Sequence, residues 1–226
     1  MDAPFVKYVI TRLGEYFSAN ALYSFNATLN YLEVGRWMRA KGYETRHRFS
    51  RREELFDFVG NQISARVVLY LEFGVFRGET TLYWSKLLSN PSSILHGFDS
   101  FEGLPENWLP QSQKGYFSTN GAIPQIDDER VRFFRGWFDE TLPKYELPLH
   151  DVLVINLDAD LYSSTHCVLR TLRNDIVPGT YIYFDEFNHR DHELRAFDEF
   201  IKETGMRFSL VGVTRTMEHV VFMRNG

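Results

Sequence analysis

The feature that most constrains the fold of this chain is an apolar run that ends in a glycine-rich turn, at residues 67–78. The run begins Val67-Val68-Leu69-Tyr70-Leu71, and a helical pattern starts near Glu79. Apolar runs of this kind are usually strands buried on both faces, as in a parallel sheet flanked by helices. Gly74 and Gly78 allow the backbone to bend sharply or to approach a ligand closely. The following helix would point free N–H groups and the positive end of its dipole at the turn. We therefore expect a nucleotide or carboxylate pocket at the end of this strand. A strand–turn–helix unit without a ligand is the alternative.

The rest of the chain alternates between apolar runs and helical patterns, which predicts an α/β fold. Further strands are expected at residues 94–98, 131–135, 152–157, 180–184, 208–213 and 219–223, and helices at residues 50–64, 79–88, 164–175 and 193–203. The first helix has a capping-box arrangement of Ser50 and Glu53. The connection between the last two strands is too short for a crossover helix. We therefore expect an antiparallel hairpin at the edge of an otherwise parallel sheet.

Two parts of the chain lie outside this regular pattern. Residues 1–50 are rich in aromatic side chains, and we interpret them as an N-terminal helical extension to a main domain at residues 51–226. Its two or three helices could pack on the main domain, cover its site as a lid, or form a dimer surface. Residues 101–130 form a long irregular stretch, which is typical of a lid or a binding segment.

Composition limits the classes of partner. The chain has 25 Lys and Arg against 30 Asp and Glu, a net charge of −5, which argues against a nucleic-acid or anionic-membrane binder. The densest basic cluster, residues 46–52, is interpreted as solvated surface charge. Cys167 is the single cysteine, so no intrachain disulfide can form, and its helical context predicts a buried core thiol. We find no signal-peptide pattern and no apolar run of membrane-spanning length, and we therefore expect a cytoplasmic protein.

Acidic residues follow three of the expected strands directly. These are Asp99, Asp158 and the pair Asp185-Glu186. The carboxyl ends of parallel strands are where open α/β sheets bind their ligands, although helix caps account for many such carboxylates. Asp99 comes about twenty residues after the glycine turn, which is the usual distance for a carboxylate that accepts hydrogen bonds from a ribose. A dinucleotide motif is broken, because Phe76 and Glu79 stand where G-x-G-x-x-G would need glycine.

Five ordered blocks of residues carry a more specific resemblance. They are residues 71–78 (LEFGVFRG), 98–105 (FDSFEGLP), 136–143 (GWFDETLP), 157–165 (LDADLYSST) and 177–186, which contains VPG and FDE. These blocks resemble class I S-adenosylmethionine-dependent methyltransferases, and more narrowly the macrocin O-methyltransferase (TylF-type) family. The similarity covers about residues 52–224, and the first 50 residues match nothing that can be transferred.

The resemblance implies a fold and a set of roles. The fold is a Rossmann-like, seven-stranded, mostly parallel sheet with an antiparallel last strand and helices on both faces. The cofactor residues that it implies are Glu72, Gly74, Gly78 and Thr80 for the methionine part, Asp99 and Ser100 for the ribose, and Gly136 and Trp137 for the adenine. Phe76, Arg77 and Asp158 are further cofactor-binding candidates. Asp158, Asp185 and Glu186 would bind a divalent cation.

A bound cation has its own physical logic. Carboxylate oxygens are hard ligands that suit Mg²⁺. A cation would lower the pKa of a substrate hydroxyl and hold its oxygen in line with the methyl group. Metal-dependent catechol-type enzymes have a lysine base three residues after the strand aspartate, and this chain has Leu161 there. Asp160 and His189 are therefore our candidates for the catalytic base.

The sequence as a whole predicts a metal-dependent O-methyltransferase that uses S-adenosylmethionine. Its acceptor would be a hydroxyl of a small molecule, and the family suggests a sugar of a glycosylated natural product or polysaccharide. Two alternatives remain: a nicotinamide-dependent oxidoreductase on a similar sheet, and a non-catalytic methyltransferase-fold module that senses its nucleotide. We expect no nucleic-acid or membrane partner, and a homo-oligomer is an open alternative.

Overall fold

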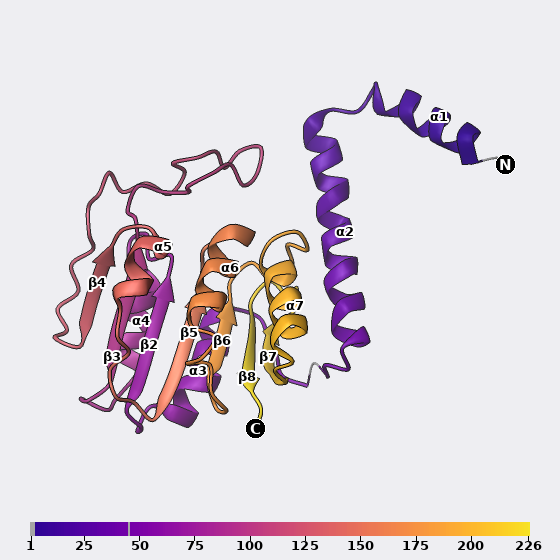
Figure 1. The fold of residues 1–226 in the computed structure, drawn as a ribbon. Helices are drawn as coiled ribbons and strands as arrows, with labels where there is room; N and C mark the ends of the chain where they lie inside the picture. Colours follow the sequence, from indigo (N-terminus) through magenta and orange to yellow (C-terminus); the bar gives the residue numbers. More distant parts are fainter. Residues whose placement is uncertain (1–2, 45) are drawn as a thin grey trace.

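The computed structural model describes residues 3–44 and 46–226, and its body is a mixed sheet with helices on both faces (Figure 1). The strands are β1 (Arg48–Phe49), β2 (Val68–Phe73), β3 (Ile94–Asp99), β4 (Val131–Arg135), β5 (Val152–Leu157), β6 (Tyr181–Phe184), β7 (Phe208–Thr214) and β8 (Val220–Arg224). The helices are α1 (Ala3–Gly14), α2 (Ala19–Ala40), α3 (Arg52–Ile63), α4 (Glu79–Leu87), α5 (Phe138–Thr141), α6 (Tyr162–Thr171) and α7 (Glu193–Thr204), with a 3-10 turn η1 (Leu142–Lys144).

The sheet has the order β1-β7-β8-β6-β5-β2-β3-β4. Every neighbouring pair is parallel except the two that involve β8, which is antiparallel to both β6 and β7. The expected hairpin and the antiparallel last strand are therefore confirmed. The structure adds an eighth strand, β1, which pairs with β7 and lies in the segment assigned to the N-terminal extension. A strand of two residues is too short to show a period in the sequence.

The core forms two layers because successive side chains of a strand point to opposite faces of the sheet. Val68 and Tyr70 of β2 pack in one apolar cluster with α3 and α4, whereas Leu69 and Leu71 pack in the other with α2, α6 and α7. All six residues of β2 are buried. The parallel strands thus end at one edge of the sheet, and the irregular segment 101–130 rises above that edge (Figure 1).

Helix α3 begins differently from the expected capping box. The backbone N–H of Ser50 donates to Glu54 Oε2 at 3.0 Å. The acidic residue that bonds back to Ser50 is therefore Glu54 rather than Glu53. Arg51 is the N-cap residue and makes no side-chain cap bond. Glu53 instead lies 3.7 Å from the Nε of Arg52. This pairing matters for the site described below.

The two N-terminal helices differ in how they are held. The C-terminal part of α2 packs on the body, where the Trp37 ring contacts Phe187 at 5.5 Å and Phe222 at 6.3 Å between ring centroids. Helix α1, all of whose residues are described, has no buried side chain and points away from the sheet (Figure 1). Within residues 3–44 and 46–226, no helix is long and apolar enough to cross a membrane.

Candidate functional site: a pocket at the carboxyl ends of the strands

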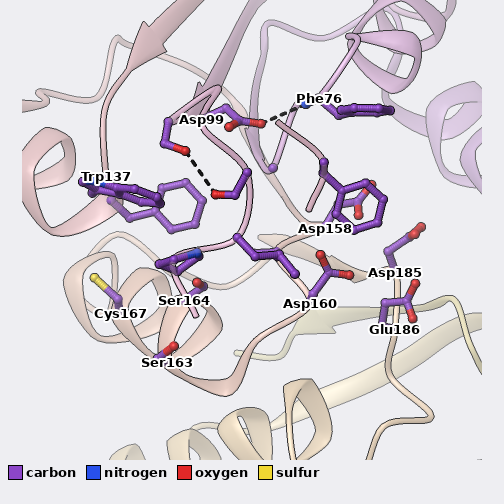
Figure 2. Close-up of a pocket in the computed structure, with 18 of the residues that line it drawn as sticks. Phe76, Asp99, Trp137, Asp158, Asp160, Ser163, Ser164, Cys167, Asp185 and Glu186 are labelled. Carbon is purple, nitrogen blue, oxygen red and sulfur yellow. Dashed lines mark hydrogen bonds between the residues drawn. The ribbon is translucent and has the colours of Figure 1, made fainter. Parts of the chain in front are cut away.

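A cavity of ≈ 750 Å³ opens at the carboxyl ends of β2, β3, β5 and β6. Its wall contains Arg52, Gly74, Phe76, Asp99, Ser100, Gly103, Leu104, Pro105, Lys114, Phe117, Trp137, Phe138, Asp139, Glu140, Asp158, Ala159, Asp160, Ser163, Ser164, Cys167, Asp185 and Glu186. Figure 2 shows the Trp137 ring at one side of this pocket and the carboxylates of Asp158, Asp160, Asp185 and Glu186 at the other, with Asp99 and Phe76 along the top. The pocket therefore has an aromatic side and an acidic side.

The turn after β2 passes so close to β5 that only glycine fits at position 74. Gly74 has φ +94, and a Cβ added to it would lie 1.8 Å from the carbonyl oxygen of Asp158. Gly78 also has positive φ and precedes α4 as its N-cap. Phe76 between them adopts φ 52, in the left-handed region that few residues other than glycine occupy. Gly74 and Phe76 of this bend both line the cavity.

Asp99 holds the same turn from the neighbouring strand. Its Oδ2 accepts the N–H groups of Val75 and Phe76, each at 2.8 Å, and its Oδ1 accepts the N–H of Phe101 at 2.7 Å. The sequence predicted a ribose-binding carboxylate here, and Asp99 does line the pocket. Its carboxylate also braces the backbone, a role that its position in the sequence does not reveal.

The acidic side carries more negative charge than its cations balance. Burial and the charges of Glu186 and Asp185 raise the pKa of Asp160 to about 8. Burial and the charges of Asp185 and Glu218 raise the pKa of Glu186 to about 8. The pKa of Asp158 is raised for the same reasons, by burial and then by Asp185 and Asp160. Such mutual perturbation of carboxyl groups within a cleft is typical of functional sites.

Asp185 is the exception, because two basic side chains contact it. Burial acts to raise its pKa, but the hydrogen bond and charge of His219 and the charge of Arg52 outweigh burial, and the pKa of Asp185 is lowered. His219 Nδ1 lies 3.0 Å from Asp185 Oδ1. The Arg52 Nη1 lies 3.3 Å from Asp185 Oδ1 and 3.9 Å from Asp158 Oδ2. A guanidinium group therefore stands between two of the carboxylates that the resemblance assigns to a metal.

Nine of the candidate residues line the pocket: Gly74, Phe76, Asp99, Ser100, Trp137, Asp158, Asp160, Asp185 and Glu186. Five others from the cofactor set, Glu72, Arg77, Gly78, Thr80 and Gly136, lie outside its wall. Glu72 is buried beneath the turn and accepts the hydroxyl of Thr81, while burial raises its pKa to about 8. Arg77 packs on the Phe76 ring, with 4.9 Å between its Cζ and the ring centroid. Glu72 and Arg77 thus contact neighbouring side chains at the turn, Thr81 and Phe76.

His189 is also separate from the pocket wall. Its ring lies 5.3 Å from the Trp108 ring and 6.1 Å from the His192 ring, between centroids. Burial, and then the charge of His192, lower its pKa to about 4. Of the two candidate bases, only Asp160 faces the cavity, and it does so from a left-handed backbone with φ 60. Because Trp108 belongs to segment 101–130, His189 contacts that segment instead.

Several pocket residues were not identified from the sequence. Arg52 belongs to the basic cluster interpreted as solvated charge, yet its side chain is only 30% exposed. Cys167, expected in the core, is half-buried and lines the pocket. Ser163 and Ser164 follow Asp160 closely in the LDADLYSST block, so the block itself could have indicated them. Lys114 lies in the irregular segment, where no periodicity shows which side chains point inward.

The sheet order, the glycine turn and the pocket above the strand ends together define a class I methyltransferase-like α/β fold. The profile of the family described as Macrocin-O-methyltransferase (TylF) matches residues 48–224. The chain therefore belongs to the macrocin-O-methyltransferase (TylF) family, as the sequence blocks predicted.

Individual relatives are more distant. The 8-demethyl-8-(2,3-dimethoxy-alpha-L-rhamnosyl)-tetracenomycin-C 4'-O-methyltransferase of Streptomyces olivaceus is 31% identical over 137 residues, which cover 52% of this chain and 52% of that protein. The demethyldecarbamoylnovobiocin O-methyltransferase of Streptomyces niveus is 26% identical over 179 residues, or 70% of this chain and 66% of that protein. The matches thus span between half and two thirds of these relatives.

A solved structure supports the fold over a longer stretch. The crystal structure of CalS11, described as a calicheamicin methyltransferase, is similar to this chain with a TM-score of 0.60 and 20% identity. The similarity covers 93% of this chain and 95% of CalS11. At this level of identity, the comparison establishes the shared fold.

Proposed function

We propose that this protein is an S-adenosylmethionine-dependent O-methyltransferase that acts on a sugar hydroxyl of a small molecule. The observation that carries the proposal is one cavity that joins the Gly74 turn, Asp99 and Trp137 to a cluster of carboxylates, in a chain of the TylF family. The name of the Streptomyces olivaceus relative contains a rhamnosyl group and specifies 4'-O-methyl transfer, which favours a glycosylated acceptor.

The aromatic side of the pocket is suited to the cofactor. S-adenosylmethionine supplies a methyl group that is already activated by a positively charged sulfur. The carboxylate of Asp99, which lines the pocket, offers an acceptor for its ribose hydroxyls, and backbone carbonyl groups of the Gly74 turn would accept from its amino group. The Trp137 ring offers an apolar surface for its adenine. The buried Glu72 and the capping Gly78 support this binding by fixing the turn.

The acidic side is suited to the acceptor hydroxyl and its proton. Asp160 faces the cavity, and its ionised form can accept the proton of a hydroxyl. Its pKa of about 8 makes that carboxylate a stronger base than an ordinary aspartate, and the ionised form predominates above this pH. We assign the base to Asp160 because His189 packs on Trp108, outside the pocket wall. Leu104 and Phe117 also line the pocket, and their apolar side chains would exclude water from the reacting hydroxyl.

We also propose that Asp158, Asp185 and Glu186 hold a divalent cation such as Mg²⁺. The donor chemistry fits, because three hard carboxylates lie at one edge of the pocket and two of them have raised pKa values. When bound, the ion would lower the pKa of a coordinated hydroxyl. Within residues 3–44 and 46–226, no three carboxylate, histidine or cysteine side chains are already arranged around a metal position. Arg52 lies between two of the expected ligands instead.

The test is methyl transfer from isotopically labelled S-adenosylmethionine to a panel of glycosides that includes rhamnosides. We expect a product heavier by one labelled CH₂ unit, formed with Mg²⁺, lost in EDTA and restored by added Mg²⁺. Asp185→Asn should abolish the stimulation by Mg²⁺, whereas Asp191→Asn, at a 70% exposed carboxylate, should retain it. Full activity in EDTA would remove the metal from this account. Binding of the cofactor without transfer to any acceptor would favour a non-catalytic module.

A further inference from the structure

The Arg52 side chain occupies a position that it would have to leave before a divalent cation could bind there. Arg52 is the first residue of α3, and its side chain reaches over the edge of the sheet to the carboxylates at the ends of β5 and β6. Its Nη1 lies 3.3 and 3.4 Å from the two oxygens of Asp185. A monovalent cation thus already balances part of the charge of Asp158 and Asp185.

A divalent ion and this guanidinium group would repel each other within the same cluster. Like charges a few ångströms apart in a partly buried site repel strongly, because little water screens them. Both would also need the same carboxylate oxygens, those of Asp185 above all. The two cations therefore exclude each other unless Arg52 moves.

Arg52 has another partner within reach. Its Nε lies 3.7 Å from Glu53 Oε1, and the Glu53 side chain is 39% exposed. Rotation of the guanidinium toward Glu53 would carry it to the surface and keep an ion pair.

We propose that Arg52 is an exchangeable counter-cation, which neutralises Asp158 and Asp185 in the metal-free protein and leaves them when a divalent cation binds. The inference rests on the metal site in the proposed function. It assigns Arg52 as a residue that competes with the ion for these carboxylates and so sets the affinity for the ion.

The test measures Mn²⁺ binding to the full chain by calorimetry and by electron paramagnetic resonance. Arg52→Met should bind Mn²⁺ about tenfold or more tightly than the wild type, because a competing charge is lost. Arg52→Lys, a variant with a shorter reach that keeps the charge, should show a smaller gain. Arg51→Met is the matched control, since Arg51 is 71% exposed and pairs with Glu54, and it should bind Mn²⁺ as the wild type does.

Unchanged or weaker Mn²⁺ binding by Arg52→Met would overturn the exchange. If that variant does not fold, wild-type affinity in Arg52→Lys would overturn it equally. Absence of Mn²⁺ binding to every protein would also overturn it. Titration of the same samples with S-adenosylhomocysteine separates this failure from a failure of the proposed function, because cofactor binding without metal binding leaves the methyltransferase assignment standing.

A second inference comes from the N-terminal helices, independently of the pocket. The exposed face of α2 carries Leu22, Phe25, Leu29 and Leu32, which are 50%, 60%, 50% and 67% exposed. Their spacing of three, four and three residues is that of the a and d positions of a coiled coil. Two helices usually bury such a stripe against each other.

The surface area supports a large missing contact. The accessible surface is 12393 Å² for a chain of 26.6 kDa. A compact monomer of this mass is expected to have roughly 10,700 Å². The excess of roughly 1,700 Å² includes the surface of α1, which has no buried side chain, and a stable interface takes ~800 Å² from each partner.

We infer that the partner is a second copy of this chain, with the two stripes packed on each other about a two-fold axis. Residues 19–32 contain no Lys, Arg, Asp or Glu, so two copies would meet without opposing like charges. The same lack of basic residues argues against an anionic membrane as the partner.

Light scattering coupled to size exclusion tests this inference on the full chain. The wild type should have the mass of two 26.6 kDa chains, and Phe25→Glu combined with Leu29→Glu should have the mass of one. Leu149→Glu is the control, since Leu149 is 95% exposed on the main body, and it should remain dimeric. A monomeric wild type, or a double variant that remains a dimer, would overturn the inference.

Discussion

Asp99 accepts a hydrogen bond from the backbone N–H of Phe76 at 2.8 Å, across the gap between the end of β3 and the turn after β2 (Figure 2). The same oxygen accepts the N–H of Val75, so one carboxylate fixes the bend through which the chain passes under the pocket. The residue expected to bind the ribose therefore also determines the shape of the turn that is expected to bind the rest of the cofactor.

We predict that Asp99→Asn weakens the binding of S-adenosylhomocysteine by about tenfold or more. An amide can offer only one oxygen, so at least one of the N–H groups of Val75, Phe76 and Phe101 would face an NH₂ group. Calorimetry measures the change, and Asp127→Asn at an exposed position is the control. Equal affinities in the two variants would show that the carboxylate is dispensable.

Gly74→Ala should destabilise the protein more than the backbone strain of an alanine can explain. The new Cβ would meet the main chain at Asp158, which no side-chain rotation can relieve. Gly179→Ala is a matched control, because Gly179 has φ +91 and open space around its missing Cβ. We expect a loss of about 1–2 kcal/mol in the free energy of unfolding for Gly179→Ala, from strain alone. The loss for Gly74→Ala should be clearly larger, and urea unfolding of both variants measures the two losses. Equal losses would show that the close approach of Gly74 to the main chain at Asp158 is unimportant.

The sequence predicts the parts of this molecule that depend on a period or a local motif. Buried runs such as residues 68–73 identified the strands of the sheet, and the resemblance set the fold and the acidic edge. Arg52 could not be predicted, because its role depends on the placement of α3 beside the ends of β5 and β6, far away in the sequence. Glu72 is the opposite case, because the sequence identified the residue but not its environment. Its side chain is buried beneath the turn rather than exposed to the cavity.

The assignment of the base predicts different outcomes at two residues. Asp160→Asn should lower kcat by about 10²–10⁴-fold while cofactor binding is retained, because the proton acceptor is lost. Asparagine suits this test, since it tolerates the left-handed backbone of Asp160. His189→Gln should leave kcat within a few fold, because His189 lies behind the pocket wall. A large loss of kcat in His189→Gln with none in Asp160→Asn would reverse the assignment.

His96 should make stability depend on pH. Burial, and then the charge of Arg132, lower its pKa from 6.5 to about 4, and its Nδ1 pairs with the Tyr145 hydroxyl at 2.7 Å. The unfolded chain binds a proton below pH 6.5 that the folded chain does not, so this stabilisation is complete above that pH and is lost as the pH falls toward 4.

Urea unfolding at about pH 7.5 and about pH 5 measures this loss. On going from the higher to the lower pH, the free energy of unfolding of the wild type should fall by roughly 1–2 kcal/mol more than that of His96→Asn. The amide of the variant keeps a polar partner for Tyr145. His150→Gln leaves His96 in place and should show the loss of the wild type. An equal loss in His96→Asn and the wild type would contradict this origin of the pH dependence.

The most direct test of the central claim is calorimetric titration of the full chain with S-adenosylhomocysteine, with NADH as the comparison. This account predicts saturable one-to-one binding of S-adenosylhomocysteine and no binding of NADH, because the glycine turn lacks the dinucleotide pattern. Binding of NADH without binding of S-adenosylhomocysteine would contradict the assignment and return the site to a nicotinamide-dependent oxidoreductase.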